Sequence, residues 1–396
     1  MMAKRVPIDT YCEKKIPTLQ KTYDGMIDYV DISSVDNTEK KIISYQTIES
    51  NDAPSRAKQL LKKGDVLVST VRPNLNAVAV VEEETENLMV GSTGYCVLRC
   101  KDNMDVRYLF NFCQSQYFVD DMSSQATGAS YPAVSNGIVR SSLIPCCSIE
   151  EQREIAEKMD TVSELLVLRK QQLAELDELI KSRFIELFGD PVTNPFGWRK
   201  LTVQQAIGEN IIDKPLDGNH GGKHPKTSDY VPSGIPFIMA NNLVEGKVDL
   251  ENCAFISRKQ ADSLDKGFAK DGDVLITHKG TIGRTAILHC SYPYIMLTPQ
   301  VTYYRPKTGL IPEYLKAYFD TNYFQGIIGN IASVGSTRAY IGITAQQELP
   351  LIVPPIEIQE QFAAFVEQTD KSKLAVQQSL EKLETLKKSL MQQYFG

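Results

Sequence analysis

The chain contains one sequence unit twice, and this duplication limits its possible folds more than any other feature. Residues 128–189 align without a gap on residues 335–396, at a constant offset of 207. The motif Gly-Asp-Val-Leu occurs at 64–67 and again at 272–275, so the repetition continues upstream with small changes in loop length. Solenoid repeats span only roughly 20–50 residues. The sequence therefore predicts a tandem duplication of one globular domain followed by one long helix.

Each copy ends in a segment with helical periodicity. Apolar residues recur every three or four positions from Met159 to Leu187, after a capping box formed by Ser148 and Glu151. Gly189 supplies a typical helix end. The second segment follows two prolines, repeats the spacing less strictly, and has lysines at 373 and 387.

A narrow apolar stripe does not stabilise an isolated helix of this length. Because the two stripes come from one duplicated unit, we expect them to pair as an antiparallel coiled coil about a pseudo-two-fold axis. The alternative is that each helix packs on its own domain. The stripe residues are candidates for the helix pair and for partner docking: Leu166, Leu173, Leu176, Ile180, Val376, Leu380, Leu383 and Leu390.

The globular parts are predicted to be α+β. Short β-branched runs bounded by Gly, Pro or Asn predict strands at 65–70 and 77–81, repeated at 273–277 and 285–288. Helical spacing predicts a short helix in each copy, at 105–117 and 312–323. The predicted organisation is two domains at 1–147 and 190–353, with long helices at 148–189 and 354–396.

Composition indicates a cytoplasmic protein. The N-terminal residues lack the apolar core of a secretory signal, and no uncharged apolar run approaches the ~20 residues of a membrane span. Eight cysteines without metal-like spacing are read as reduced thiols. The net charge of −6 is unfavourable for a simple nucleic-acid binder, although residues 146–189 alone carry −4 and the two domains are close to neutral.

The sequence contains no recognisable catalytic, cofactor or metal motif. Residues 221–224 lack the first glycine and the hydroxyl of a phosphate-binding loop, and residues 280–283 lack the third glycine of a dinucleotide fingerprint. The tetrad expected of amino-methyltransferases is absent. His220 and His224 have no third ligand nearby in sequence, so a polar loop is the simpler interpretation. We expect this chain to bind no metal or cofactor itself.

The repeated motif Gly-Asp-Val-Leu is followed in each copy by a polar loop, at 69–76 and at 277–284. The motif is retained while the loop residues differ, and Arg, Lys, Asn and Thr are residues that contact phosphates and base edges. A second matched pair of loops precedes the long helices, and residues 223–224 add a further polar loop. Ordinary solvated hairpins are the alternative. The candidate DNA-binding residues are Arg72, Asn74, Asn76, Ser130, Tyr131, Lys223, His224, Lys279, Thr281, Arg284, Thr337 and Arg338.

Together these features resemble the specificity subunits of type I restriction-modification systems. Residues 24–32, 53–56 and 64–76 are similar to one target-recognition domain of that family, and 234–238 with 272–275 to another of different specificity. Residues 195–198 resemble the entry into a second recognition domain, and 354–359 resemble the start of the helical region. The resemblance covers nearly the whole chain. The one departure is a pair of cysteines at 146–147, where the second copy has prolines.

The resemblance implies a non-catalytic subunit with two recognition domains, each reading one half of a split, asymmetric DNA site. It implies that the paired helices dock two modification subunits, which carry S-adenosylmethionine and methylate adenine at N6. It further implies that two restriction subunits, which use ATP and Mg²⁺, join the complex and cleave DNA.

Three alternatives remain at this point. A single-chain DNA methyltransferase or nuclease would need a catalytic domain, and no stretch of ~200 residues is left for one. A two-headed coiled-coil adaptor for proteins would fit the net charge of −6, and DNA binding at low salt would distinguish it. The chain could also be the recognition part of another DNA methyltransferase system.

Overall fold

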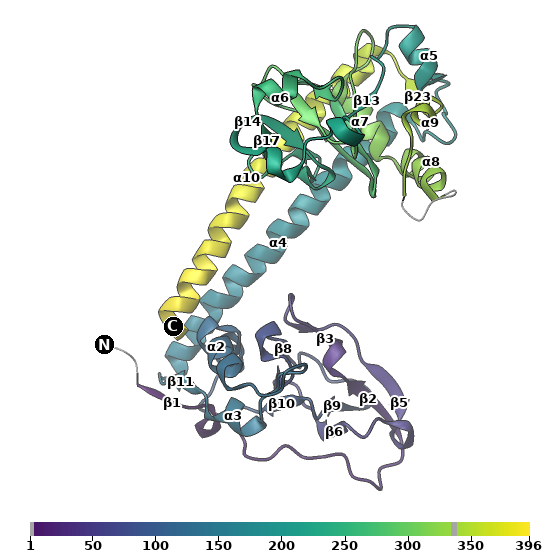
Figure 1. Ribbon diagram of the computed structural model, residues 1–396. Coiled ribbons are helices and arrows are strands. Elements are labelled where there is room, and N and C mark those ends of the chain that lie inside the picture. The colour runs from purple at the N-terminus through teal and green to yellow at the C-terminus, as the bar shows by residue number, and fades with distance from the viewer. Residues whose placement is uncertain (1–3, 334–338) are drawn as a thin grey trace. The chain divides into compact units, whose positions relative to one another are not determined.

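The computed structural model describes residues 4–333 and 339–396 (Figure 1). The chain divides into two compact units. Unit 1 contains residues 1–171 and 377–396, and unit 2 contains residues 172–376. Two long helices, α4 (Ile149–Phe188) and α10 (Ile356–Phe395), begin in one unit and end in the other.

Unit 1 has two main sheets, in addition to the two-stranded pairs β1-β11 and β3-β4. In the first, the strand order is β5-β2-β9-β6, and β2 runs parallel to β9. In the second, β7 lies between β10 and β8, and all pairs are antiparallel. The bounds are β1 Arg5–Pro7, β2 Met26–Val30, β3 Val35–Asp36, β4 Lys41–Ile42, β5 Gln46–Glu49, β6 Ala57–Leu60, β7 Val66–Ser69, β8 Val78–Val80, β9 Leu88–Ser92, β10 Tyr95–Leu98, β11 Leu143–Pro145, α1 Val106–Gln114, α2 Gln116–Gln125 and α3 Asn136–Ser141.

Unit 2 repeats this topology. One sheet has the order β17-β14-β21-β18, with β14 parallel to β21, and the other contains the series β22-β19-β20. The bounds are β12 Arg199–Thr202, α5 Val203–Gly208, β13 Leu216–Asp217, β14 Tyr230–Ile238, β15 Leu243–Val244, β16 Lys247–Val248, β17 Ala254–Ile256, α6 Arg258–Asp262, β18 Phe268–Ala269, β19 Val274–Lys279, β20 Thr281–Ile287, β21 Ile295–Leu297, β22 Val301–Tyr304, α7 Pro312–Asp320, α8 Asn322–Ser333, α9 Ile343–Gln347 and β23 Pro350–Val353. The predicted α+β duplication is confirmed.

A buried ion pair explains why Gly-Asp-Val-Leu is repeated. The carboxylate of Asp65 accepts two hydrogen bonds of 2.7 Å from Arg99, which directly follows the neighbouring strand β10, and the Asp65 side chain is only 1% exposed. Asp273 and Arg305 make the same pair in unit 2, at 2.8 Å. Gly64 precedes the aspartate with a φ of +88°, a conformation that favours glycine. The motif is therefore a structural element that holds the strand before the candidate loop.

The repeated glutamine near the start of each long helix is also structural. In unit 1, the buried side chain of Gln152 accepts a hydrogen bond from the backbone N–H of Asp105 at 2.9 Å. Its amide donates to the carbonyls of Asn103 and Cys147. Gln359 makes the equivalent three bonds in unit 2. Each glutamine therefore joins its long helix to the loop before a short helix. Because a buried amide must be hydrogen-bonded, the same loop geometry is required in both units.

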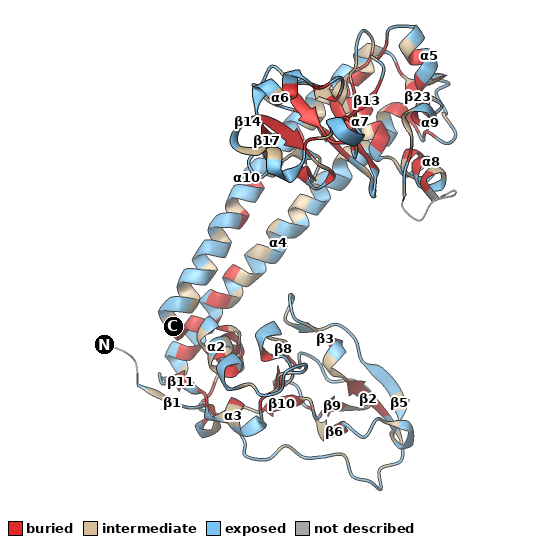
Figure 2. Cartoon of the chain, viewed as in Figure 1, coloured by how far each residue is buried: buried red, intermediate tan, exposed pale blue. Residues whose placement is uncertain are grey.

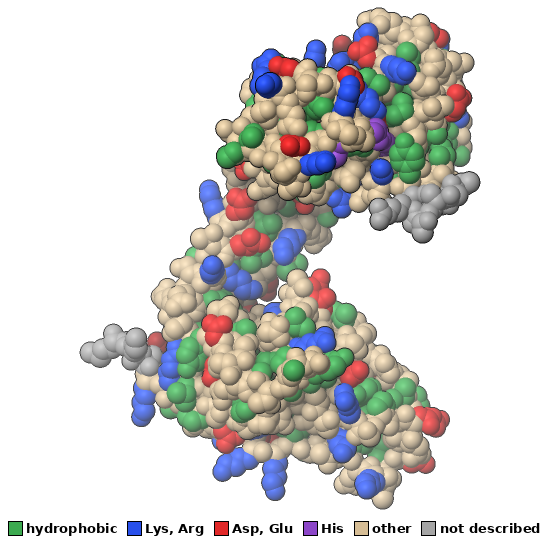
Figure 3. Space-filling model, in the orientation of Figure 1, with side chains coloured by type: hydrophobic (Ala, Val, Ile, Leu, Met, Phe, Trp, Pro, Cys, Tyr) green, Lys and Arg blue, Asp and Glu red, His purple; other side chains and the backbone are tan. Residues whose placement is uncertain are grey.

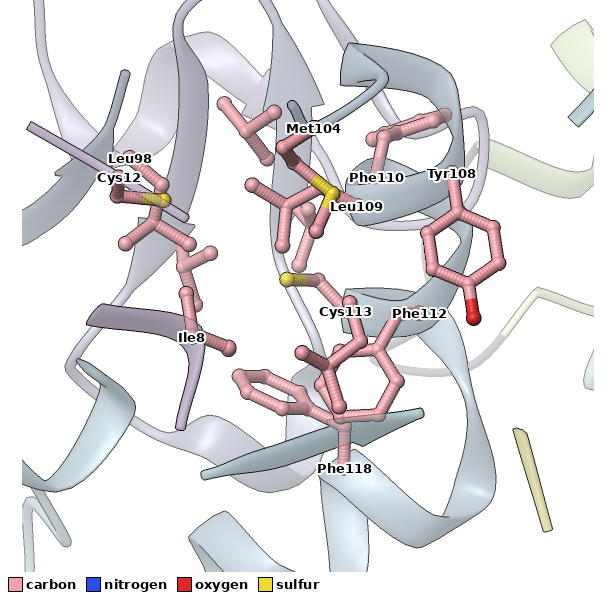
Figure 4. Close-up of a cluster of buried hydrophobic side chains, with 14 of the residues drawn as sticks. Ile8, Cys12, Leu98, Met104, Tyr108, Leu109, Phe110, Phe112, Cys113 and Phe118 are labelled. Carbon is pink, nitrogen blue, oxygen red and sulfur yellow. The ribbon is translucent and has the colours of Figure 1, made fainter. Parts of the chain in front are cut away.

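In unit 1, the start of α4 lies beside the end of α10. Ile155 and Met159 of α4 share a buried cluster with Phe395. The ring of Phe395 is 5.2 Å from that of Tyr108, which lies in the same domain core as Phe112 (Figure 4). The start of one helix is thus paired with the end of the other, as an antiparallel pair requires.

The same contact occurs in unit 2 with the helices exchanged. Phe188 at the end of α4 is 5.4 Å from Phe362 near the start of α10, and 4.6 Å from Tyr314. In Figure 2, buried residues recur along both helices between exposed ones. The predicted antiparallel pairing is confirmed, and the alternative of two helices packed separately is wrong.

The predicted short helices are each two helices. Ser115 separates α1 from α2, and its hydroxyl accepts a hydrogen bond from the N–H of Phe118. Thr321 separates α7 from α8 and bonds the N–H of Phe324 in the same way. A hydroxyl side chain that caps a new helix competes with continuation of the old one. Apolar periodicity alone did not predict that each segment forms two helices.

Candidate nucleic-acid interface

In unit 1 the structure brings two predicted loops together. The backbone N–H of Arg72 donates to the carbonyl of Pro132 at 2.7 Å, and Val71 and Ala133 form a β-bridge. The guanidinium of Arg72 lies 4.8 Å from the ring centroid of Tyr131, whose side chain is 68% exposed. An exposed arginine beside an exposed aromatic ring offers hydrogen-bond donors and a stacking face at one place.

Asn76 holds the loop from within. Its side-chain N–H donates to the carbonyl of Cys113 at 2.8 Å, and its oxygen accepts from Lys40 at 2.9 Å. Arg72 and Asn76 both have positive φ angles, +49° and +48°. The loop conformation thus depends on the amide of Asn76, which is already bonded. Lys40, which the sequence analysis did not select, is part of this support.

Asn74 and Ser130 are exposed, and neither side chain has a hydrogen-bond partner among residues 4–333 and 339–396. Asn74 lies in the 3-10 helix Pro73–Leu75, between the two residues with positive φ. Both side chains are available to an external ligand.

In unit 2 the predicted loop 277–284 is a tight hairpin. The strands run on to Lys279 and resume at Thr281, because Gly280 takes a φ of +80° at the turn. Gly283 has a φ of +85°. The predicted strand ends at 277 and 285 are therefore wrong, since these glycines allow pairing to continue through the polar residues.

The hairpin presents polar side chains outward. Lys279 is exposed, with its Nζ 5.9 Å from the ring centroid of Tyr340, and its backbone forms a bridge to that residue. Thr281 and Arg284 are also exposed. The backbone N–H of Arg284 donates to Thr277, and the described residues contain no partner for its guanidinium.

The remaining candidates in unit 2 differ in environment. Lys223 is exposed and paired with Asp265 at 2.5 Å. The ring of His224 is half-buried beside Phe237, and burial, with repulsion from His220, lowers its pKa. Histidine side chains lie on the face of unit 2 seen in Figure 3. The remaining two candidates, Thr337 and Arg338, lie outside the described residues.

The candidate docking residues lie along the helix pair. Val376 and Leu380 are buried, at 7% and 8% exposure, and the other six are partly buried. Lys373, at one of the weaker positions of the stripe, forms an ion pair with Asp177 at 2.5 Å. Ile180 packs on the buried cluster of unit 2, and Leu390 on that of unit 1. Seven further apolar residues of the two helices are exposed and were not among the candidates chosen from the sequence: Leu165, Val167, Leu168, Leu179, Ile185, Leu374 and Leu386.

In the part of the chain that the structure describes, no three His, Cys, Asp or Glu side chains are placed to share a metal ion. Within the same residues, no helix combines the length and apolar content needed to cross a membrane.

Two curated proteins are examples of the sequence similarity. The chain is 21% identical over 318 residues to the EcoKI specificity subunit of a type I restriction enzyme from Escherichia coli strain K12. It is 21% identical over 277 residues to the MjaVIII specificity subunit from Methanocaldococcus jannaschii. The matches cover 76% and 68% of this chain, and 67% and 65% of those relatives.

Solved structures agree in fold. A chain from a study of complex assembly and conformational transition of the type I R-M system is 25% identical, with a TM-score of 0.63. The comparison covers 99% of this chain and 97% of that one. The S subunit of a type I restriction-modification system from M. genitalium has a TM-score of 0.60 at 14% identity, covering 100% and 99%, and shows the fold alone.

The family model for the type I restriction modification DNA specificity domain matches twice, at residues 8–178 and 216–386. Each match contains one set of candidate loops and most of one long helix. The chain therefore belongs to the type I restriction-modification DNA specificity domain family, and is a non-catalytic DNA sequence-specificity subunit with two copies of that domain.

Proposed function

We propose that the chain binds a bipartite, asymmetric DNA site, with unit 1 reading one block and unit 2 the other. The recognition domains are assigned to residues 1–147 and 190–353, and the helices at 148–189 and 354–396 to spacing and partner docking. The observation that carries the proposal is the contrast between a shared frame and different exposed side chains. The Asp–Arg pair is the same in both units, but the loop that follows it is not.

The different loops imply different target sequences. In unit 1 the loop places Arg72 against Tyr131, and in unit 2 the hairpin places Lys279 near Tyr340. Arginine forms bidentate bonds with guanine, whereas lysine is a single point of charge. Two domains with the same frame and different donors would read unlike blocks, which makes the combined site asymmetric.

The partners are part of the same proposal. Two modification subunits dock on the helices and methylate adenine at N6 within the bound site, and two restriction subunits join for cleavage. S-adenosylmethionine, ATP and Mg²⁺ belong to those partners. Exposed apolar residues on both helices support docking there. We also propose a cytoplasmic location, since all eight cysteines are free thiols.

Loop variants should affect one block at a time. In the complex with its modification subunits, Arg72→Ala is expected to lose about 1–3 kcal/mol of discrimination at one base pair of the first block. Lys279→Ala or Arg284→Ala should have this effect in the second block only. Methylome sequencing of cells that carry each variant, followed by binding to duplexes with single substitutions, measures both effects.

Lys21→Ala is the matched control for Arg72→Ala, because Lys21 is an exposed cation of unit 1 outside the candidate loops. It should leave both blocks unchanged. Asn76→Ala should also weaken the first block, but through loss of loop geometry and with lower thermal stability. Equal recognition of both blocks by all the loop variants would place the DNA-reading surface elsewhere.

A further inference from the structure

A cavity of about 320 Å³ lies inside unit 2, beside the candidate hairpin. It is bounded by the segment before β14, by the end of β19 and by the connection from β21 to β22. Its lining includes His220, His224, Lys279, Thr298 and Gln300. The last two were not selected from the sequence, because no motif marks the β21–β22 connection.

Two polar atoms at this cavity are buried without a partner. Thr298 is only 4% exposed, and its hydroxyl has no hydrogen-bond partner in the described residues. Nδ1 of His224 is likewise buried and unpartnered among them. Buried polar groups are nearly always hydrogen-bonded in folded proteins. Both atoms are therefore free to form a hydrogen bond with a ligand or an ordered water in the cavity.

The cavity offers both donors and acceptors. The side-chain oxygen of Gln300 accepts a long hydrogen bond of 3.4 Å from the N–H of Ala240, which leaves its amide N–H groups for a ligand. Lys279 adds a charged donor at the edge. Burial favours the neutral ring of His224 by lowering its pKa, and a neutral imidazole has one accepting nitrogen. The Thr298 hydroxyl can donate or accept.

This mixture fits a base better than a phosphate. Phosphate oxygens only accept hydrogen bonds, whereas the base edges in the major groove present donors and acceptors in distinct patterns. His220 is held beside the cavity by a bond of 2.6 Å between its Nε2 and Asp217, which also pairs with Lys266. The buried carboxylate of Asp217 thus positions the cavity wall, and Lys266 compensates its charge.

Unit 1 has the same backbone hydrogen bonds, but an apolar side chain occupies the position that corresponds to the cavity. The N–H of Thr70 donates to the carbonyl of Gly94 at 2.9 Å, as that of His278 does to Gln300. A Cβ at Gly94 would lie 2.3 Å from Cδ1 of Ile32, so the isoleucine occupies the space over this glycine.

In unit 2 the large and the small side chain have exchanged places. Ala240 stands where unit 1 has Ile32, and Gln300 where it has Gly94. Ser92, the equivalent of Thr298, accepts a hydrogen bond from the N–H of Gly94 at 3.3 Å. The unpartnered hydroxyl and the larger polar side chain are therefore particular to unit 2.

We propose that this cavity receives one base edge of the DNA block read by unit 2, with Thr298 and Gln300 as specificity-determining residues. The proposal rests on the proposed function and adds a reading position that the hairpin alone does not supply. Because unit 1 closes the same place with an apolar side chain, the two domains read their blocks through different sets of positions on one frame.

The test uses the full chain in complex with its modification subunits. Methylome sequencing first identifies the two blocks for the unchanged protein. Duplexes with each base pair of the second block replaced in turn are then bound to Thr298→Val and Gln300→Leu. Valine keeps the shape of threonine without the hydroxyl, and Gln300 is exposed at the cavity edge, so both variants should fold.

Each variant is expected to lose roughly ten- to hundredfold in affinity for the cognate duplex. The loss should disappear for duplexes substituted at one base pair of the second block, and discrimination within the first block should be unchanged. Gln204→Leu is the matched control, since Gln204 is an exposed glutamine of the same unit away from the cavity.

Unchanged affinity and discrimination in both variants would overturn the proposal. Equal weakening on every duplex, whatever its sequence, would also overturn it, because that is the behaviour of a phosphate contact. Failure of the unchanged complex to methylate any split site would instead contradict the proposed function itself, which is a different result.

Discussion

Replacing Asp65 with alanine is expected to destabilise unit 1 by about 3–5 kcal/mol, the usual cost of leaving one charge of a buried pair without its partner. Arg99 would keep a guanidinium that is only 12% exposed, and would lose both hydrogen bonds to the carboxylate. Hydrogen exchange of the β7 and β10 amides measures the effect within unit 1. Asp102→Ala removes an exposed carboxylate nearby and is the matched control.

The equivalent change in unit 2, Asp273→Ala, should expose β19 and β22 to exchange and leave β7 and β10 protected. The double change of Asp65→Ala with Arg99→Leu should recover part of the lost stability, since it removes the unpaired charge as well. If Asp65→Ala had no more effect on hydrogen exchange than Asp102→Ala, the ion pair would not explain why the motif Gly-Asp-Val-Leu is present in both copies.

The duplication made much of the fold predictable. A constant offset over 62 residues, 128–189 onto 335–396, required the same elements in the same order in both halves. Apolar periodicity, strict in the first helix and weaker in the second, then left few ways to bury both stripes. The structure confirms the antiparallel pairing because residues such as Phe188 and Phe395, identical in the two copies, occupy equivalent cores.

The bounds of the helices and strands were predicted less well, because single residues decide where an element ends. Ser115 and Thr321 cap new helices within segments whose apolar spacing favoured one continuous helix. Gly280 and Gly283 allow strand pairing through residues that composition described as a loop. In both cases a single side chain or φ angle decided the backbone, and a window-based pattern averages over such residues.

Candidate site residues were harder to assign because polarity does not distinguish a free side chain from a bonded one. Asn74 and Asn76 are two positions apart in the same loop, yet among the residues that the structure describes only the side chain of Asn76 has hydrogen-bond partners. Thr298 carries no sequence signal, because its distinguishing property is a buried hydroxyl that has no partner in the described part of the chain. The equivalent hydroxyl of Ser92 in unit 1 is bonded to the N–H of Gly94, a difference that the residue types alone do not show.

The helix pair contains a surface that the two copies share. Two identical modification subunits would dock most simply on equivalent surfaces, so their contacts should include exposed residues that are the same in both copies. Leu179 and Leu386 meet this condition, since they occupy equivalent positions and are 48% and 44% exposed. The lysine and serine that follow at 181–182 recur at 388–389.

Leu179→Asp should therefore remove one modification subunit, and Leu386→Asp the other, with each change costing about 2–4 kcal/mol of binding as for a central interface residue. The charge must be desolvated on docking, but it stays in water in the free chain, so stability should be preserved. Native mass spectrometry of the reconstituted complex should show one bound copy for each single variant and none for the double variant.

Ile185→Asp is the matched control, because Ile185 is 47% exposed on the same helix but has Gln392 at its equivalent position. It should leave both copies bound. The stripe leucines at 173 and 176 are poor sites for this experiment, since they are partly buried and a charge there would also disturb the helix pair. Two bound copies in the double variant would show that the partners contact another surface. If Ile185→Asp also lost a bound copy, the contact would depend on exposed apolar residues in general and not on those that the two copies share.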